Sequence, residues 1–186
     1  MKAHLGLHNR IVAALAVVFL TASSAFAQTD RLDELFSRLK TADASESGRI
    51  STEIWDEWSK SGSAAMDLLL KRGRDAMTEG RPELAIEHLT ALIDHAPDFA
   101  EGWNARATAY YQAGLLGPAV GDIAHVLSLN PRHFGALAGL GAIFEELEKP
   151  EQALEVYNAA LALNPHADGL EAAVKRIETD LQGSDL

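Results

Sequence analysis

Residues 100–133 read AEGWNARATAYYQAGLLGPAVGDIAHVLSLNPRH, and this stretch sets a pattern that the neighbouring sequence repeats. Its landmarks are two large side chains, two small ones and a closing proline: Trp103, Tyr110, Ala107, Ala119 and Pro131. The proline recurs 34 residues earlier and 34 residues later, as Pro97 and Pro165. A fixed period of this length indicates a repeat architecture, in which each period is one supersecondary unit.

The segments on either side carry matching residue types in the same phase. In residues 66–99 the matching positions are Leu69, Gly73, Ala76, Ala85 and Pro97, and in residues 134–167 they are Leu137, Gly141, Phe144, Ala153 and Pro165. This pattern resembles the tetratricopeptide repeat (TPR), written W-x2-L-G-x2-Y, A-x3-F, P over 34 residues. Arg72 and Arg106 depart from it, because they replace a leucine. We expect their stems to cover apolar neighbours while their charged heads reach water.

The resemblance implies an all-α fold, a right-handed α-solenoid of three TPR helix pairs over residues 66–99, 100–133 and 134–167. Small residues fall where two helix backbones approach closely, and no single pair can bury its own apolar face. A C-terminal capping helix is predicted over residues 168–182, followed by a tail at 183–186. Its apolar stripe is Leu170, Val174, Ile177 and Leu181.

Residues 28–65 are predicted to form an N-terminal helical hairpin. Leu35 and Leu39 belong to one helical stripe, and Trp55 and Trp58 belong to a second. All four fall on core positions when the 34-residue frame is extended backwards, which suggests a degenerate fourth repeat that caps the stack. The alternative is an unrelated amphipathic hairpin laid on the first repeat, and the sequence leaves both open.

Residues 1–27 have the order of a secretory signal peptide. Lys2 and Arg10 precede the apolar run IVAALAVVFL at 11–20, and Ala25-Phe26-Ala27 supplies an A-x-A cleavage site. Cleavage after Ala27 would give a periplasmic or secreted protein without a membrane span. A retained membrane anchor is the alternative.

Charge and motif content exclude several classes of function. The formal net charge of −11 becomes −11 − 2 = −13 once the two basic residues of the signal are removed, which disfavours nucleic-acid binding. There is no cysteine, and no nucleophile-elbow, zinc-protease, P-loop or dinucleotide motif. We therefore predict no enzyme activity, no cofactor and no metal. His95, Asp98 and His133 would be the first residues to inspect if a catalytic cluster existed.

In the TPR family, peptide partners usually bind the concave face that the first helix of each repeat lines. The resemblance implies a partner-binding groove at Lys71, Arg74, Asn104, Thr108, Tyr111 and Glu145. Some members clamp a partner's C-terminal carboxylate with Lys, Arg and Asn, which Lys71, Arg74 and Asn104 would supply in part. Ala138 and Ala142 stand where further cations would be needed, so a full clamp is absent.

The sequence thus favours a non-catalytic protein–protein interaction module, an adaptor or scaffold of the bacterial periplasm that holds a peptide or partner subunit in its groove. The alternative is a structural subunit of a cell-envelope assembly, docked through its N-terminal helices. Exposure of Trp55 and Trp58 would favour the alternative, and burial of both would favour the groove.

Overall fold

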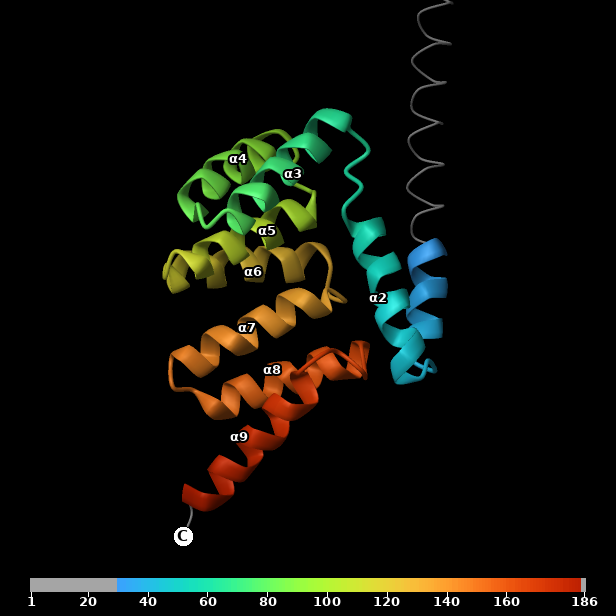
Figure 1. Ribbon diagram of the computed structural model, residues 1–186, viewed down its shortest axis with the longest axis vertical. Coiled ribbons are helices and arrows are strands. Elements are labelled where there is room, and N and C mark those ends of the chain that lie inside the picture. Colours follow the sequence, from blue (N-terminus) through green and yellow to red (C-terminus); the bar gives the residue numbers. More distant parts are fainter. Residues whose placement is uncertain (1–29, 185–186) are drawn as a thin grey trace, which may run out of the picture.

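The computed structural model describes residues 30–184, and every regular element in that range is an α-helix (Figure 1). After a helical segment at residues 30–39, the helices are α2 (Ala44–Trp58), α3 (Ala64–Thr78), α4 (Pro82–His95), α5 (Ala100–Gln112), α6 (Leu116–Leu129), α7 (Phe134–Glu146), α8 (Pro150–Leu163) and α9 (Leu170–Ser184). The predicted fold class is confirmed: three TPR helix pairs form a solenoid, with an N-terminal hairpin and a C-terminal capping helix. The predicted signal peptide lies outside the described residues.

The three repeats are the helix pairs α3–α4, α5–α6 and α7–α8, and each pair packs against the next. Glycine allows the two helices of a pair to approach closely. A Cβ atom on Gly73 would lie 2.6 Å from Cγ of Leu89, and one on Gly141 would overlap the ring of Tyr157. The spacing of small residues in the sequence therefore corresponds to real helix crossings. The capping helix α9 covers the last repeat through Ile177, which packs with Ala153 and Tyr157.

The turn within each repeat requires a left-handed backbone at one position. Gly80 (φ +69°) and Gly114 (φ +72°) occupy it in the first two repeats, and Glu148 (φ +55°) occupies it in the third. The three turns share one hydrogen-bond pattern, in which the residue after this position donates to the carbonyl five residues back. Glu148 is the one non-glycine residue with a positive φ in the described part of the chain.

The N-terminal hairpin, defined here as residues 30–58, lies along one side of the stack (Figure 1). Neither sequence-based alternative is correct, because the hairpin neither caps the stack as a fourth repeat nor lies mainly on the first repeat. Its aromatic contacts are with the start of α7: the ring of Trp58 stacks on His133 at 4.2 Å between centroids, and Trp55 meets Phe134 edge-on at 5.7 Å. The hairpin therefore covers the ends of helices where one repeat turns into the next.

Polar contacts extend this docking along the side of the stack. Ser47 donates to Oδ1 of Asn164 at the end of α8 (3.2 Å), and Asn164 donates in turn to Ser51 (3.1 Å). Arg132 pairs with Asp33 at 2.7 Å. Ser47 and Asn164 are both buried, so these hydrogen bonds replace lost contacts with water.

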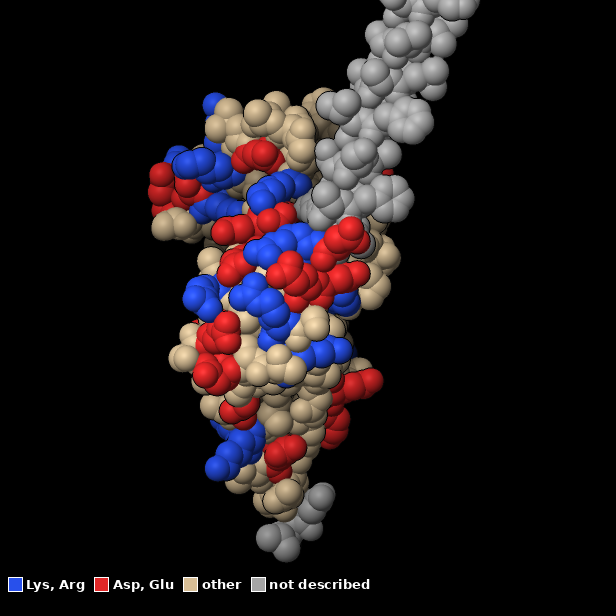
Figure 2. Space-filling view, turned by 90° about the vertical axis from the view of Figure 1, so that its right-hand side faces the viewer, with Lys and Arg blue, Asp and Glu red and all other residues tan. Residues whose placement is uncertain are grey.

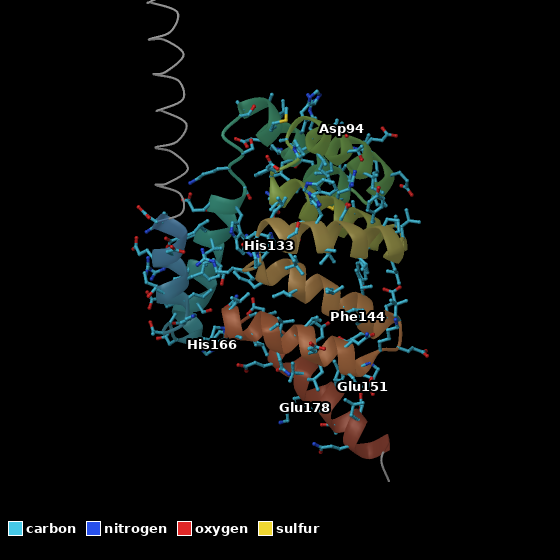
Figure 3. All side chains as sticks on the ribbon, turned by 180° about the vertical axis from the view of Figure 1, so that it is seen from behind. Asp94, His133, Phe144, Glu151, His166 and Glu178 are labelled. Carbon is cyan, nitrogen blue, oxygen red and sulfur yellow. The ribbon has the colours of Figure 1, made fainter. Side chains whose placement is uncertain are left out.

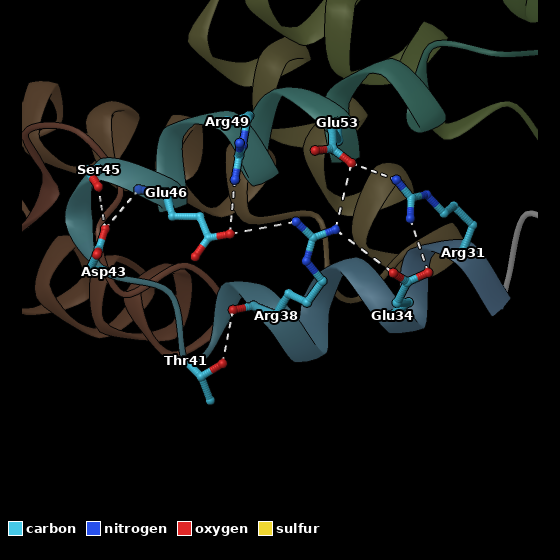
Figure 4. Close-up of polar contacts among 9 residues, drawn as sticks. All are labelled: Arg31, Glu34, Arg38, Thr41, Asp43, Ser45, Glu46, Arg49 and Glu53. Carbon is cyan, nitrogen blue, oxygen red and sulfur yellow. Dashed lines mark hydrogen bonds and ion pairs between the residues drawn. The ribbon is translucent and has the colours of Figure 1, made fainter.

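The outer surface of the hairpin carries interspersed charges. Arg31 bridges Glu34 and Glu53, and Arg38 lies within 4.0 Å of the same two carboxylates (Figure 4). On the face of the molecule that carries the hairpin, acidic and basic side chains alternate and neither sign forms a separate patch (Figure 2). Such exposed pairs contribute little to stability individually, so the docking of the hairpin depends mainly on its buried aromatic contacts.

The expectation for Arg106 is wrong, whereas Arg72 is exposed as predicted. The Arg106 side chain is largely buried, with 14% of its surface exposed. It makes a bidentate pair with Asp122, through Nε–Oδ2 at 2.7 Å and Nη2–Oδ1 at 2.9 Å, and Nη1 donates to Thr90. The hydrogen bond to Asp122 raises the pKa of Arg106 further above its ordinary value. The position of Asp122 is not part of the repeat pattern, so the sequence did not indicate this ion pair.

Replacing Glu148 by glycine should stabilise the protein. Glycine removes the steric cost of a left-handed residue, about 1–2 kcal/mol. It also increases the conformational entropy of the unfolded chain, which offsets part of that gain in stability. We expect a net gain of about 0.5–1 kcal/mol and a Tm higher by about 2–3 °C, measured by circular dichroism. Gly114→Glu makes the reverse change at the same phase of the second repeat and should lower Tm. A Glu148→Gly protein no more stable than the parent would contradict this account of the turn.

Replacing Arg106 by leucine, the residue that the repeat pattern prefers, should destabilise the protein by about 3 kcal/mol, because Asp122 is left buried and unpaired. The double variant Arg106→Leu/Asp122→Leu should return to within about 1 kcal/mol of the parent, since no buried charge remains. Urea denaturation measures both. Equal stability of the single and double variants would show that the ion pair is not what stabilises this helix crossing.

Candidate functional site: the groove between the first helices of the repeats

The first helices of the three repeats form a continuous inner wall, because α3 contacts α5 and α5 contacts α7. Between α5 and α7 this wall contains a hollow of about 110 Å³. Its lining is mostly apolar or small and consists of Ala107, Ile123, Gly135, Ala136, Gly139, Ala142 and Ile143, with Asn104, Thr108 and Tyr111 supplying the polar groups. A few polar groups around an apolar floor is the usual composition of a binding site.

The sequence of α7 accounts for the hollow. Gly135, Gly139 and Ala142 leave one side of the helix almost without side chains, so α5 and α7 enclose a space there. A Cβ atom on Gly139 would lie 3.8 Å from Cδ1 of Ile123, which is ordinary contact. The hollow is therefore open at Gly139, whereas Gly135 is already covered by the ring of Trp55 from the hairpin.

Tyr111 stands at the open edge of the hollow with 39% of its surface exposed. Partial burial, together with the neighbouring Glu146 carboxylate, raises the pKa of the Tyr111 phenol above its ordinary value. The side chain presents a hydroxyl on an apolar ring, a combination that is enriched where proteins contact partners.

The structure brings three of the six sequence-predicted site residues together in the hollow, namely Asn104, Thr108 and Tyr111. The other three lie outside the hollow and are paired with other residues of the molecule. Lys71 is exposed and pairs with Asp75 at 2.6 Å, on the same helix. Glu145 accepts from Tyr157 (2.8 Å) and from Arg176 of the capping helix. Burial would raise the pKa of Glu145, but the hydrogen bonds from Arg176 and Tyr157 outweigh it and lower that pKa.

The third, Arg74, holds an internal carboxylate. Its Nη2 donates to Oε1 of Glu101 at 2.5 Å, and Nδ2 of Asn104 donates to Oε2 of the same carboxylate at 3.2 Å. Nε2 of His133 lies 3.0 Å from that Oε2. Because Nδ1 of His133 accepts from the backbone N–H of Ala136 at 3.1 Å, the ring proton resides on Nε2 and is donated to Glu101.

Sequence reasoning missed the burial of Glu101 and His133, whose surfaces are 3% and 0% exposed. One signal was available. The position of His133, the last residue of its repeat, is occupied by Phe99 and Ala167 in the equivalent turns. A polar residue at a position that is otherwise apolar indicates specific hydrogen bonds. Here Nδ1 of His133 caps α7 and Nε2 reaches Glu101.

The three residues flagged for a catalytic cluster do line one cleft, of about 480 Å³, beside the end of α2. Both ring nitrogens of His133 are committed to structural hydrogen bonds, and His95 and Asp98 are exposed. Within residues 30–184 no group of His, Cys, Asp and Glu side chains is arranged to hold a metal ion. In the same range no helix has the length and apolar character needed to cross a bilayer.

The fold and the groove define a helical-repeat interaction module, and comparison with known proteins gives its family. A tetratricopeptide-repeat family model matches residues 70–124 and 119–168, so this chain belongs to the tetratricopeptide-repeat family. It is 37% identical over 155 residues to a TPR repeat-containing protein of Rhizobium etli, a match that covers 83% of this chain and 76% of that protein.

Two more distant likenesses fit this family. The chain is 31% identical over 121 residues to the SGT1 homolog of Bos taurus, covering 65% of this chain but only 36% of the bovine protein. Among solved structures it resembles the first TPR domain of Spaghetti (RPAP3) bound to the HSP90 peptide SRMEEVD, with a TM-score of 0.61 and 25% identity. That match covers 64% of this chain and 95% of the domain. Related TPR domains are protein–protein interaction modules, and this chain shares their architecture.

Proposed function

We propose that this protein is a non-catalytic adaptor of the bacterial periplasm that binds a segment of a partner protein in the groove between α5 and α7. The observation that carries the proposal is the open apolar hollow beside Tyr111. The groove exists before a partner arrives, because it is built on packed helices, so binding orders little of the protein itself.

The chemistry of the hollow suggests what it takes. A volume of about 110 Å³ with an apolar floor suits one inserted aliphatic or aromatic side chain. Asn104 and Thr108 already donate to Glu101 and to the Asn104 carbonyl, so their side-chain oxygens, together with the Tyr111 hydroxyl, would accept hydrogen bonds from the backbone N–H groups of the inserted segment. Because the net charge would be −11 − 2 = −13 after removal of the signal, a neutral or basic segment is favoured over an acidic one.

The relatives support a peptide as the ligand, but not the same peptide. The RPAP3 domain was solved with an acidic HSP90 peptide, SRMEEVD. In this chain Arg74 and Asn104 already hold Glu101, and the equivalent wall of α7 is Gly135, Gly139 and Ala142. The partner is therefore anchored by an apolar side chain and not by a terminal carboxylate.

The positions of the two hairpin tryptophans favour the groove over docking through the N-terminal helices. Trp58 is 7% exposed, and Trp55 is partly buried against Gly135 and Phe134. Both rings are thus used inside the molecule, and the outer face of the hairpin presents mixed charges (Figure 2). No observation on the described surface favours the envelope-subunit alternative.

Filling the hollow should abolish partner capture without unfolding the protein. Gly139→Leu places a side chain in the open space and removes a helix-interior glycine, so the fold should be retained or slightly stabilised. Gly121→Leu makes the same change on the exposed side of α6, where nothing lies within 4 Å. We expect capture of the partner from envelope extract to fall at least about tenfold with Gly139→Leu and to be unchanged with Gly121→Leu.

Partners are identified by mass spectrometry, and circular dichroism confirms that both variants are folded. Equal capture by parent, Gly139→Leu and Gly121→Leu would rule out the hollow as the binding site.

The periplasmic location is tested separately, because the signal peptide is inferred from sequence. The full chain expressed in a Gram-negative bacterium should appear in the periplasmic fraction with Gln28 as its first residue, as determined by intact-mass measurement. An Ala27→Phe variant should accumulate uncleaved, since the pattern needs a small residue there. Recovery of the uncleaved parent in the membrane fraction would instead identify residues 11–28 as a retained anchor.

A further inference from the structure

The Glu101 carboxylate is held by donors from the first repeat, the second repeat and the junction of the second repeat with the third. Arg74 lies on α3 in the first repeat, Asn104 lies on α5 in the second, and His133 is the last residue of the second repeat and caps α7. Figure 3 labels His133 where the hairpin meets the stack. Residues 27, 3 and 32 positions away in sequence therefore converge on one pair of oxygen atoms.

The arrangement of these donors is that of an anion-binding site. They comprise one guanidinium, one amide N–H and one imidazole N–H, aimed at both oxygens of a single carboxylate that is 2% exposed. A carboxylate so deeply buried requires such donors, and the guanidinium among them favours an anion over a neutral acceptor. Arg74 is further fixed because Nη1 and Nη2 each lie 3.1 Å from Oγ of Ser59, at the end of α2.

We propose that Glu101 is the built-in occupant of an anion-binding site formed by Arg74, Asn104 and His133, and that it excludes partner segments presenting a carboxylate at this end of the groove. The site lies against the cleft of about 480 Å³ that Glu101 and His133 line together with Lys60 and His95. A small carboxylate entering from that cleft would reach the three donors if the Glu101 side chain were absent.

The existence of the anion site does not depend on the proposed function. The role of the site in selecting partners does rest on the proposed function. The partner's segment must take the apolar hollow next to Asn104, because Arg74, Asn104 and His133 already donate to Glu101. Glu101 is in this sense a specificity-determining residue that touches no partner itself.

Chemical rescue tests the site. Glu101→Ala removes the acceptor that the three donors share and should lower Tm by about 10 °C. Acetate matches the two carbons and two oxygens that the substitution removes. At a concentration about tenfold above its Kd, acetate should raise the Tm of Glu101→Ala by about 4 °C relative to acetamide, at constant ionic strength.

Three controls make the result specific. Glu101→Gln fills the same volume, so acetate should have no effect on it. Leu92→Ala opens a cavity at a fully buried apolar position without donors, and acetate should not stabilise it either. The parent, whose site is occupied, should also be insensitive.

The inference is overturned if acetate and acetamide act alike on Glu101→Ala, or if acetate shifts all four proteins equally. If Glu101→Ala is unfolded in chloride, acetate should restore its helical circular dichroism spectrum. Failure to do so, with Glu101→Gln folded, would also contradict the inference. If the proposed groove function is wrong, the Gly139→Leu and Gly121→Leu variants will capture partners equally, but the acetate result will not change. The two failures are therefore distinguishable.

Discussion

Each helix pair of this protein can bury its apolar face only against the next pair, and the rest of the structure depends on that stacking. Close crossings at Gly73 and Gly141 keep the two helices of a pair together, and α9 covers the face that the last repeat leaves open. The curvature that stacking produces places α3, α5 and α7 on one inner wall. A groove is thus a consequence of packing, and its particular character is set by the side chains at a few wall positions.

Two features give this wall its individual character. The small residues of α7 open an apolar hollow opposite Tyr111, and the buried Glu101 carboxylate uses the polar donors beside it. The same carboxylate also connects the hairpin to the repeats, because Arg74 reaches Ser59 and His133 stacks on Trp58. One buried acid therefore links the position of the hairpin to the polar side chains beside the groove, through Arg74 and His133.

The sequence predicted more of the fold than of the site. The groove residues named from the repeat phase divide evenly: Asn104, Thr108 and Tyr111 meet in the hollow, while Lys71, Arg74 and Glu145 are paired elsewhere. Phase along a helix predicts which face a residue occupies, but it does not predict which neighbouring side chain forms an ion pair with it. The signal peptide and the periplasmic location remain predictions from sequence.

By itself, the sequence determined the helix pairs, their 34-residue period and their stacking, because each repeat contains the same spacing of apolar and small residues along its own helices. The tertiary structure alone decided where the hairpin lies, that Arg106 pairs with Asp122, and that Glu101 and His133 are buried together. Those contacts occur once each and join distant segments, as Ser47 and Asn164 do across 117 residues. A contact made once leaves no period in the sequence, so only the folded chain reveals it.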